Sequence, residues 1–323
     1  MKKDLSKFEL RQIGRKTYDE IYARGLFGST SAAPSGTLRG IDVLPSDIIR
    51  QKLNRAIQVY YGQKGVLPNL IRPSTFFEKL TISKFFAPII MPSPADKLNV
   101  SAFVPDGLAF KVKTIDVMWE GYQPITRKII DSLGLPQGKY YAKSSGGTGR
   151  NIRFTVPLTD KDALKIEENS ANWLIDPHGV RAGEWWYDLM RAKNFIEADL
   201  SPNDGSLTDW KFHCGGGEIL AIQVDHGRHS QHTQTLYDAD FKQIPEELFF
   251  PFGPPEAKPI FVDNMILLSK MISRHFEFVR VDLYHSGDTI FVGELTLAPM
   301  GGQRPPNSYA LDKTMGSTWP FSL

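Results

Sequence analysis

The spacing of apolar and polar residues divides the chain into a helix-rich first part and a strand-rich second part. Residues 4–24 predict a polar helix. In residues 45–62 apolar side chains recur every three or four positions, the period of an amphipathic helix, and Ser46 is the expected N-cap. Residues 73–86 predict a further helix, whereas the glycine- and serine-rich residues 25–40 indicate a linker or loop.

From about residue 110 onward, short runs rich in β-branched and aromatic residues alternate with polar ones, which favours strands. The expected strands are residues 109–117, 139–145, 151–156, 194–200, 209–214, 218–225, 279–284 and 289–297, and the expected helices between them are residues 125–134, 160–176 and 264–276. Strands clustered in hairpins, with helices inserted between them, predict an α+β fold rather than regular βαβ alternation.

Composition narrows the class of protein further. The 323 residues are 41% hydrophobic and 23% charged, which is ordinary for a globular protein with a large core. The net charge is only +2 and the basic residues are scattered, so a nucleic-acid partner is not expected. The single cysteine, Cys214, excludes a disulfide within the chain and suits a reducing cytoplasm. The charged N-terminal segment does not fit a signal peptide, and no apolar run is long enough to span a membrane.

A glycine-rich segment, AKSSGGTGRN at residues 142–151, lies between two expected strands. Such a loop lets backbone N–H groups approach phosphate oxygens without interference from Cβ atoms, and Lys143 would add a cation. It is not a Walker A loop, because the terminal Gly-Lys-Ser/Thr is absent and no helix follows. The alternative reading is an ordinary flexible hairpin loop.

The hairpin of residues 279–302 carries charges on otherwise apolar strands. If its loop has three residues, 286–288, then Asp282 and Glu294 are diagonal neighbours on one face, about 7–8 Å apart. Two carboxylates at that separation can bind a hard cation such as Mg²⁺, and Arg280 beside them suits a phosphoryl or carboxylate oxygen. The alternative is a salt bridge on a solvated sheet face.

Several sequence blocks, in the same order along the chain, resemble the ATP-grasp superfamily and within it the TupA-like branch found in bacterial polysaccharide gene clusters. The blocks are PSTFFEKL (73–80), ADKLNVSAFV (95–104), FIEADL (195–200), LTDWKFHCGGGEILAIQVD (207–225) and FVRVDLY…GELTLAPMGG (278–302). The resemblance runs from about residue 68 to the C-terminus. It implies an α+β ATP-grasp fold in which two sheet-containing subdomains sandwich ATP, preceded by an N-terminal helical extension.

The domain boundaries expected from this resemblance are residues 1–44 for an N-terminal extension and linker, 45–135 for a helical region ahead of the ATP-grasp core, and 136–323 for the nucleotide-binding and catalytic subdomains. The resemblance also implies a role for each matching residue. The ATP-binding set is Lys97, Lys143, Ser145, Gly146, Gly147, Gly149, Glu197, Leu200 and Asp204; the Mg²⁺ ligands are Asp282 and Glu294; the catalytic set is Arg280, Lys211 and Arg228; and the substrate-side set is His232, Gln303 and Arg304.

Three of these assignments have open alternatives. Lys211 would reach the γ-phosphate, or it is a solvated strand lysine. Arg228 and His232 would grip an acceptor carboxylate, or they belong to a structural loop. Thr296 stands where many ATP-grasp enzymes carry an asparagine that binds metal, so one or two Mg²⁺ ions remain possible.

The function that the resemblance implies is an ATP- and Mg²⁺-dependent carboxylate–amine ligase that forms an amide through an acyl phosphate. Its substrates would be small molecules, an amino acid and a uronic acid or amino sugar, possibly nucleotide-linked, in surface polysaccharide synthesis. The alternatives are a glycosyltransferase-like polysaccharide enzyme and a nucleotide-binding protein that has lost catalysis. The sequence leaves the individual substrates and the oligomeric state open.

Two other patterns in the sequence suggest different chemistry. His226, His229 and His232 are spaced by three, which would suit zinc, but no cysteine or histidine set accompanies them. The aromatic segment 184–190 would stack a sugar or, more commonly, fill a core.

Overall fold

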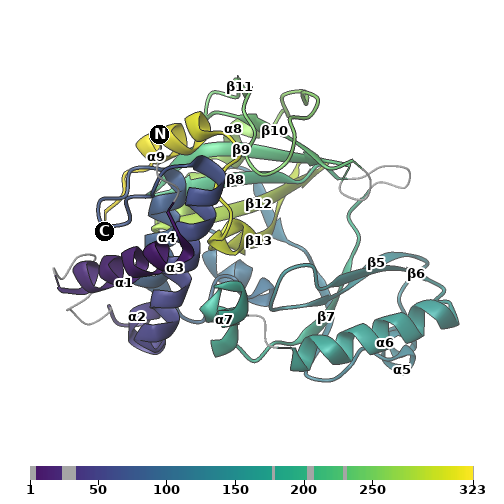
Figure 1. Ribbon diagram of the computed structural model, residues 1–323. Coiled ribbons are helices and arrows are strands. Elements are labelled where there is room, and N and C mark those ends of the chain that lie inside the picture. Colours follow the sequence, from purple (N-terminus) through teal and green to yellow (C-terminus); the bar gives the residue numbers. More distant parts are fainter. Residues whose placement is uncertain (1–4, 24–33, 177–178, 202–206, 228–230, 323) are drawn as a thin grey trace. The chain divides into compact units, whose positions relative to one another are not determined.

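The structure, a computed structural model, describes residues 5–23, 34–176, 179–201, 207–227 and 231–322 (Figure 1). The chain divides into two compact units. Unit 1 comprises Met1–Met91, Asp209–Asp282 and Thr296–Leu323, and unit 2 comprises Pro92–Thr208 and Leu283–Leu295. Neither unit is continuous in sequence, because the chain leaves unit 1 before residue 92 and returns to it after residue 208.

The helices of unit 1 come mainly from the first 86 residues. They are α1 (Lys7–Ala23), α2 (Gly40–Val43), α3 (Ser46–Lys64), α4 (Phe76–Phe86), α8 (Val262–Ser273) and α9 (Tyr309–Thr318), with a 3₁₀ turn at η4 (Pro299–Gly302). Helix α4 is buried on every side, and Thr75 and Glu78 close its first turn as a capping box. The predicted N-cap of α3 is wrong: Pro45 is the N-cap, and Ser46 is the first helical residue.

The strands of unit 1 follow the order β11-β10-β9-β8-β12. Their bounds are β8 (Trp210–Gly215), β9 (Glu218–His226), β10 (Thr233–Tyr237), β11 (Gln243–Ile244) and β12 (Phe278–Ser286), and a separate pair joins β1 (Thr37–Leu38) to β2 (Ile89–Ile90). The core beneath this sheet joins α4, α9 and β12, since the Phe76 and Phe278 rings lie 5.5 Å apart and the Phe278 and Trp319 rings 5.3 Å. The Phe278 ring also lies 6.3 Å from the ring of His213, so this aromatic core borders a polar residue of β8.

Unit 2 is built on an antiparallel sheet of order β4-β7-β5-β6. Its strands are β4 (Val117–Gly121), β5 (Gly138–Ser144), β6 (Asn151–Val156) and β7 (Asn194–Ala198); its helices are α5 (Arg127–Ser132), α6 (Asp160–Ile175) and α7 (Gly179–Ala182), with 3₁₀ turns η2 (Lys97–Phe103) and η3 (Trp185–Leu189). Helices α5 and α6 lie together on one side of this sheet (Figure 1). The remaining strands, β3 (Lys111–Thr114) and β13 (Thr289–Thr296), pair in parallel.

The α+β class predicted from the sequence is confirmed, but two local predictions are wrong. The single strand expected at 109–117 is split between β3 and β4, which belong to different sheets. The turn between β12 and β13 has two residues, Gly287 and Asp288, rather than three. The register assumed for the hairpin is therefore wrong. Along β13 the buried residues are Ile290, Val292 and Leu295, so the interval between them changes from two residues to three.

Among the described residues no helix is long and apolar enough to cross a membrane. The domain boundaries predicted from the sequence stay predictions.

Candidate functional site

The glycine-rich loop that joins β5 to β6 in unit 2 is held at both ends by hydrogen bonds. Ser144 N donates to the Arg150 carbonyl at 3.0 Å, and Ser145 N donates to the Lys193 carbonyl at 2.8 Å. Gly147 and Gly149 have φ values of +84° and +73°, a region that side chains with a Cβ rarely adopt. The predicted nucleotide contact Ser145 is fully buried, and its hydroxyl accepts from Lys193 N at 3.1 Å.

Arg150 ties this loop to the end of α6. Its guanidinium donates to the carbonyls of Trp173 and Asp176, each at 2.8 Å, and to the Asp176 carboxylate at 2.9 Å. These carbonyls belong to the last turn of a helix, where no intrahelical partner is available. The loop is therefore anchored to a rigid element, and sequence analysis did not single out the residue that anchors it.

Lys97, a predicted phosphate ligand, lies at the start of η2 and reaches the same loop. Its Nζ donates to the Gly147 carbonyl at 2.9 Å and lies 3.5 Å from the Glu294 carboxylate. Its backbone N–H donates to the Ser145 carbonyl at 3.1 Å. The structure thus brings together, inside unit 2, a predicted phosphate ligand, the predicted phosphate loop and one predicted metal ligand.

Lys143 and Glu197, predicted to contact phosphate and adenine, form an ion pair with each other across β5 and β7. Glu197 is almost completely buried and Lys143 is half-buried. The segment after β7 is fixed by Asp199, whose N–H donates to the Lys139 carbonyl at 3.0 Å and whose carboxylate pairs with Arg153. Leu200, the next residue of this predicted hinge, is partly buried. Its predicted contact with adenine stays a prediction.

In unit 1, Lys211 on β8 is buried among three carboxylates. Its ammonium pairs with Asp209 and lies 3.4 Å from Asp225 and 3.9 Å from Asp282. The side chains of Lys211, Asp225 and Asp282 are each only 4% exposed, so the lysine is not the solvated strand residue of the alternative reading. A cation so buried is tolerated because the carboxylates compensate it.

Arg280 and Asp282, neighbours on one face of β12, form a bidentate ion pair. Nε and Nη2 of Arg280 each lie 2.6 Å from one Asp282 oxygen. Nη2 also donates to the Thr296 hydroxyl at 3.0 Å, so the residue that replaces a metal-binding asparagine here supports the arginine. Burial raises the pKa of Asp282 to about 6, although Arg280 and Lys211 each act to lower it.

A buried polar network continues from this cluster along β8, β9 and β10. The Asp225 carboxylate accepts from the side-chain amides of Gln223 and Gln234, each at 2.9 Å, and lies 3.1 Å from His232 Nε2. Gln223 in turn contacts His213 Nε2 at 2.7 Å. Burial lowers the pKa of His213 to about 3, so its ring is neutral at physiological pH.

The predicted substrate-side residues His232 and Arg304 meet at one aromatic ring. The His232 ring centroid lies 3.8 Å from that of Phe250, and the Arg304 guanidinium carbon lies 5.6 Å from the same centroid. Gln303 is partly buried just after η4, where its N–H donates to the Met300 carbonyl at 3.2 Å. Phe250 was not found from the sequence.

Two predicted residues, Asp204 and Arg228, lie outside the described residues, as does His229 of the histidine pattern. Among the residues that are described, no group of three or more His, Cys, Asp or Glu side chains could hold a metal ion. Asp282 belongs to unit 1 and Glu294 to unit 2, so the predicted metal pair stays a prediction.

We compared the sequence of the chain with models of known protein families. Residues 159–319 match the family described as TupA-like ATPgrasp. The chain contains a TupA-like ATP-grasp domain. The match begins at the N-cap of α6 and covers Lys211, Arg280, Asp282 and Glu294, whereas Lys97 and the glycine-rich loop precede it. The helices α1 to α4 also precede the ATP-grasp domain, as the predicted N-terminal helical extension requires.

Solved structures that resemble the chain include several ATP-grasp ligases. The ATP-grasp ligase PsnB complexed with minimal precursor is 11% identical with a TM-score of 0.35, covering 64% of this chain and 52% of its own. D-alanine–D-alanine ligase from Bacillus anthracis complexed with ATP is 11% identical with a TM-score of 0.41, covering 70% and 64%. The enzyme from Helicobacter pylori is 10% identical with a TM-score of 0.37, covering 71% and 60%.

The chain spans about half to two thirds of the length of the solved structures it matches. No curated protein matches its sequence.

Sequence analysis missed His213 and Gln223 in the buried polar network, although the sequence carries a detectable signal for them. Each alternates with another polar residue on a strand that is otherwise apolar, His213 with Lys211 on β8 and Gln223 with Asp225 on β9. Alternate residues of a strand point to the same face, so such a pattern marks a polar stripe inside a buried sheet.

Proposed function

We propose that this protein is an ATP- and Mg²⁺-dependent carboxylate–amine ligase that forms an amide bond through an acyl phosphate. Within that class, we propose that it joins an amino acid to a uronic acid or amino sugar in surface polysaccharide biosynthesis. The ligase class follows from membership in the ATP-grasp ligase family. The choice of sugar and amino acid rests on the resemblance of the sequence to the polysaccharide-associated branch.

The observation that carries the proposal is the pairing of opposite charges among the predicted site residues within each unit. In unit 2, Lys97 lies 3.5 Å from Glu294, and Lys143 pairs with Glu197. In unit 1, Arg280 pairs with Asp282. Each pair joins a cation suited to phosphate to a carboxylate suited to Mg²⁺ or to the adenine amino group.

The residues present fit ATP with a divalent cation. Lysine and arginine side chains suit phosphate oxygens, and carboxylates are the ligands that Mg²⁺ prefers. Without a ligand, buried charges of opposite sign compensate each other, which avoids the cost of isolated buried ions. The phosphates of ATP would replace the carboxylate partner of each cation, and Mg²⁺ would replace the cationic partner of Asp282 and Glu294, whereas Glu197 would exchange Lys143 for the neutral amino group of adenine.

When bound, ATP supplies the phosphoryl group that turns a carboxylate into a reactive acyl phosphate. Lys97, Lys143 and the glycine-rich loop would hold the phosphates, while Asp282 and Glu294 would hold the cation. Arg280 would neutralise the acyl phosphate oxygens, and Lys211 would offset charge on the transferred phosphoryl group. In the second step the amine nitrogen bonds to the acyl carbon, phosphate leaves with the electron pair of the broken C–O bond, and the nitrogen loses a proton. Such catalysis depends on positioning and charge neutralisation rather than on a side-chain nucleophile.

The experiment is a turnover assay with ATP, Mg²⁺ and paired pools of amino acids, sugar acids and amino sugars. The proposal expects ADP and phosphate only when an acid and an amine are both present, together with a product of their combined mass minus water. Asp282→Asn should abolish turnover without unfolding the protein, whereas Asp240→Asn, at an exposed carboxylate, should leave turnover unchanged.

Two outcomes would support the alternatives instead. Consumption of a nucleotide sugar without ATP hydrolysis would indicate a glycosyltransferase. Binding of ATP with no turnover for any acid–amine pair would indicate a nucleotide-binding protein without catalysis.

A further inference from the structure

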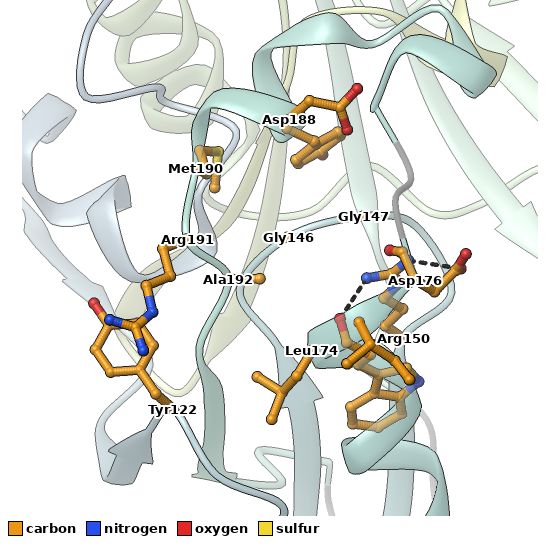
Figure 2. A pocket seen from close by; sticks show the side chains of 13 residues that line it. Tyr122, Gly146, Gly147, Arg150, Leu174, Asp176, Asp188, Met190, Arg191 and Ala192 are labelled. Carbon is orange, nitrogen blue, oxygen red and sulfur yellow. Dashed lines mark hydrogen bonds and ion pairs between the residues drawn. The ribbon is translucent and has the colours of Figure 1, made fainter.

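A pocket of about 430 Å³ lies within unit 2 beside the glycine-rich loop (Figure 2). This volume falls in the range of sites that bind small molecules. Apolar side chains line the pocket from two segments, Leu174 from the end of α6 and Met190 and Ala192 from the segment before β7. Gly146 and Gly147 of the loop form part of the lining, so an occupant of the pocket would touch the loop directly.

The pairing of β5 with β7 places one arginine next to this loop. Ser144 pairs with Asn194 in the antiparallel ladder, and Ser145 and Lys193 exchange hydrogen bonds just beyond it. A Cβ added to Gly146 would lie 3.5 Å from the Ala192 Cβ, so the pairing continues one step further. Arg191 is the next residue of this segment, and it lines the pocket together with Gly146 and Gly147.

Arg191 provides the pocket with a cation available to a ligand. Its guanidinium carbon lies 4.1 Å from the centroid of the Tyr122 ring, and Figure 2 shows the two side chains against each other on one side of the pocket. Among the described residues Arg191 forms no ion pair with a carboxylate. A guanidinium that stacks on an aromatic face keeps the N–H groups of its edge available for a bidentate oxyanion.

The neighbouring cations are already compensated. Lys193 lies over the same Tyr122 ring at 5.4 Å, but its ammonium pairs with Glu120 at 2.6 Å. Arg150, on the opposite side of the pocket in Figure 2, is occupied by Asp176 and the carbonyls at the end of α6. Two carboxylates also line the pocket: Asp176 pairs with Arg150, and Asp188 accepts from Gly179 N at 2.8 Å. The remaining guanidinium and the apolar side chains complement a single carboxylate attached to an apolar group better than a phosphate dianion.

We propose that this pocket binds an amino acid with an apolar side chain, whose α-carboxylate pairs with Arg191 and whose side chain packs against the apolar lining residues such as Leu174. Because the Asp188 carboxylate already accepts from Gly179 N, we assign the amine no partner in the pocket, and it remains the reacting group. This assignment deepens the proposed ligase function and rests on it for the fate of the amine. Binding itself requires no turnover, so the two can fail separately.

The test is calorimetric titration of the full chain with leucine and with two compounds that each lack one of its groups, in the absence and presence of Mg²⁺ and a non-hydrolysable ATP analogue. Leucinamide lacks the carboxylate, and 4-methylpentanoate lacks the amine. Leucine and 4-methylpentanoate should bind with similar affinity, and leucinamide should bind about 10- to 100-fold more weakly, because a charge-assisted pair is lost. Both enantiomers of leucine are included.

Variants assign the effect to Arg191. Arg191→Gln should weaken leucine binding by about 10- to 100-fold and leave leucinamide unchanged. Arg181→Gln is the matched control: it removes an exposed arginine on α7, which does not line the pocket, and should not change either affinity. Serine, which lacks an apolar side chain, should bind more weakly than leucine to the unaltered protein.

Several results would overturn the proposal. These are equal affinities for leucine and leucinamide, no effect of Arg191→Gln, no binding of leucine under either condition, or binding of glucuronate that depends on Arg191 and is tighter than that of leucine. If the turnover assay succeeds while leucine binding does not depend on Arg191, the ligase function stands and this pocket assignment fails. If leucine binding depends on Arg191 but no acid–amine pair consumes ATP, the pocket stands and the ligase function fails.

Discussion

Replacing Asp282 with asparagine should change how the stability of the metal-free protein depends on pH. Asp282 is 3% exposed, and burial raises its pKa to about 6, compared with 3.8 for an unperturbed aspartate. The folded state therefore holds a proton at this carboxyl between about pH 6 and pH 4, where the unfolded chain has already released it. Because the folded state binds more protons in this window, the contribution of this group to stability is full below about pH 4 and is lost as the pH rises through 6.

The magnitude follows from the two pKa values. A difference of about 2 units corresponds to about 3 kcal/mol between the limits of low and high pH. Across the narrower and experimentally easier interval from about pH 7.5 to about pH 5, the same two values give about 1.4 kcal/mol. An asparagine keeps the size and one acceptor for Arg280 but does not titrate, so Asp282→Asn removes this dependence and leaves that of all other groups.

The assay is urea unfolding of both proteins in EDTA at several pH values between 5 and 7.5. The free energy of unfolding of the unaltered protein, minus that of the variant, should increase by about 1.4 kcal/mol as the pH falls. A difference that stays constant, or that decreases toward pH 5, would show that Asp282 titrates with an ordinary or lowered pKa, and the argument from burial would be refuted. Addition of Mg²⁺ and ATP should stabilise the unaltered protein at pH 7.5 and have much less effect on the variant.

Three further predictions follow from the loop and the buried network. Arg150→Ala should release the loop from α6 and raise the KM for ATP more than it lowers kcat, which steady-state kinetics measures. It should also lower the stability by about 1 kcal/mol in thermal unfolding, because two carbonyls at the end of the helix lose their donor. Gly147→Ala should destabilise by about 1–2 kcal/mol, because its φ is +84° and the new Cβ would lie 2.9 Å from Arg150 Nε, whereas Gly62→Ala in α3, with open space around it, should stabilise by up to about 1 kcal/mol in the same denaturation assay. Asp225→Asn should turn an amide N–H group toward Lys211 and reduce ATP turnover by about 10- to 100-fold with unchanged circular dichroism; full turnover would show that the buried network has no role at the site.

Periodicity and turn chemistry predicted the regular elements well where one face of an element is buried. The helices α3, α4 and α6 begin within three residues of their predicted starts, because each has a start signal in its sequence. The split of residues 109–117 was not predictable from alternation alone. The two halves join different sheets, and pairing partners distant in sequence decide this.

The hairpin shows why site geometry was harder to predict than the site residues. The sequence identified Arg280 and Asp282 as chemically important, but the register was wrong because the turn Gly287–Asp288 has one residue fewer than assumed. A shift of one residue in register moves every side chain to the opposite face. The interval between buried residues of β13 changes between Val292 and Leu295. This change depends on tertiary packing and is not predictable from the local sequence.

The network around Lys211 explains how charged and polar side chains can be buried in the sheet of unit 1. Asp225 alone accepts from two glutamine amides and lies near His232 and Lys211, so four polar groups depend on one carboxylate. Replacing such a network with apolar residues is commonly neutral or stabilising in other proteins, so stability alone gives no reason to keep it. Lys211 and Asp282 belong to the ATP-grasp domain and are held rigidly by this network before any ligand arrives. If Lys211 and Asp282 meet the phosphoryl group as we propose, pre-organisation of their charges accounts for both the burial and the pairing.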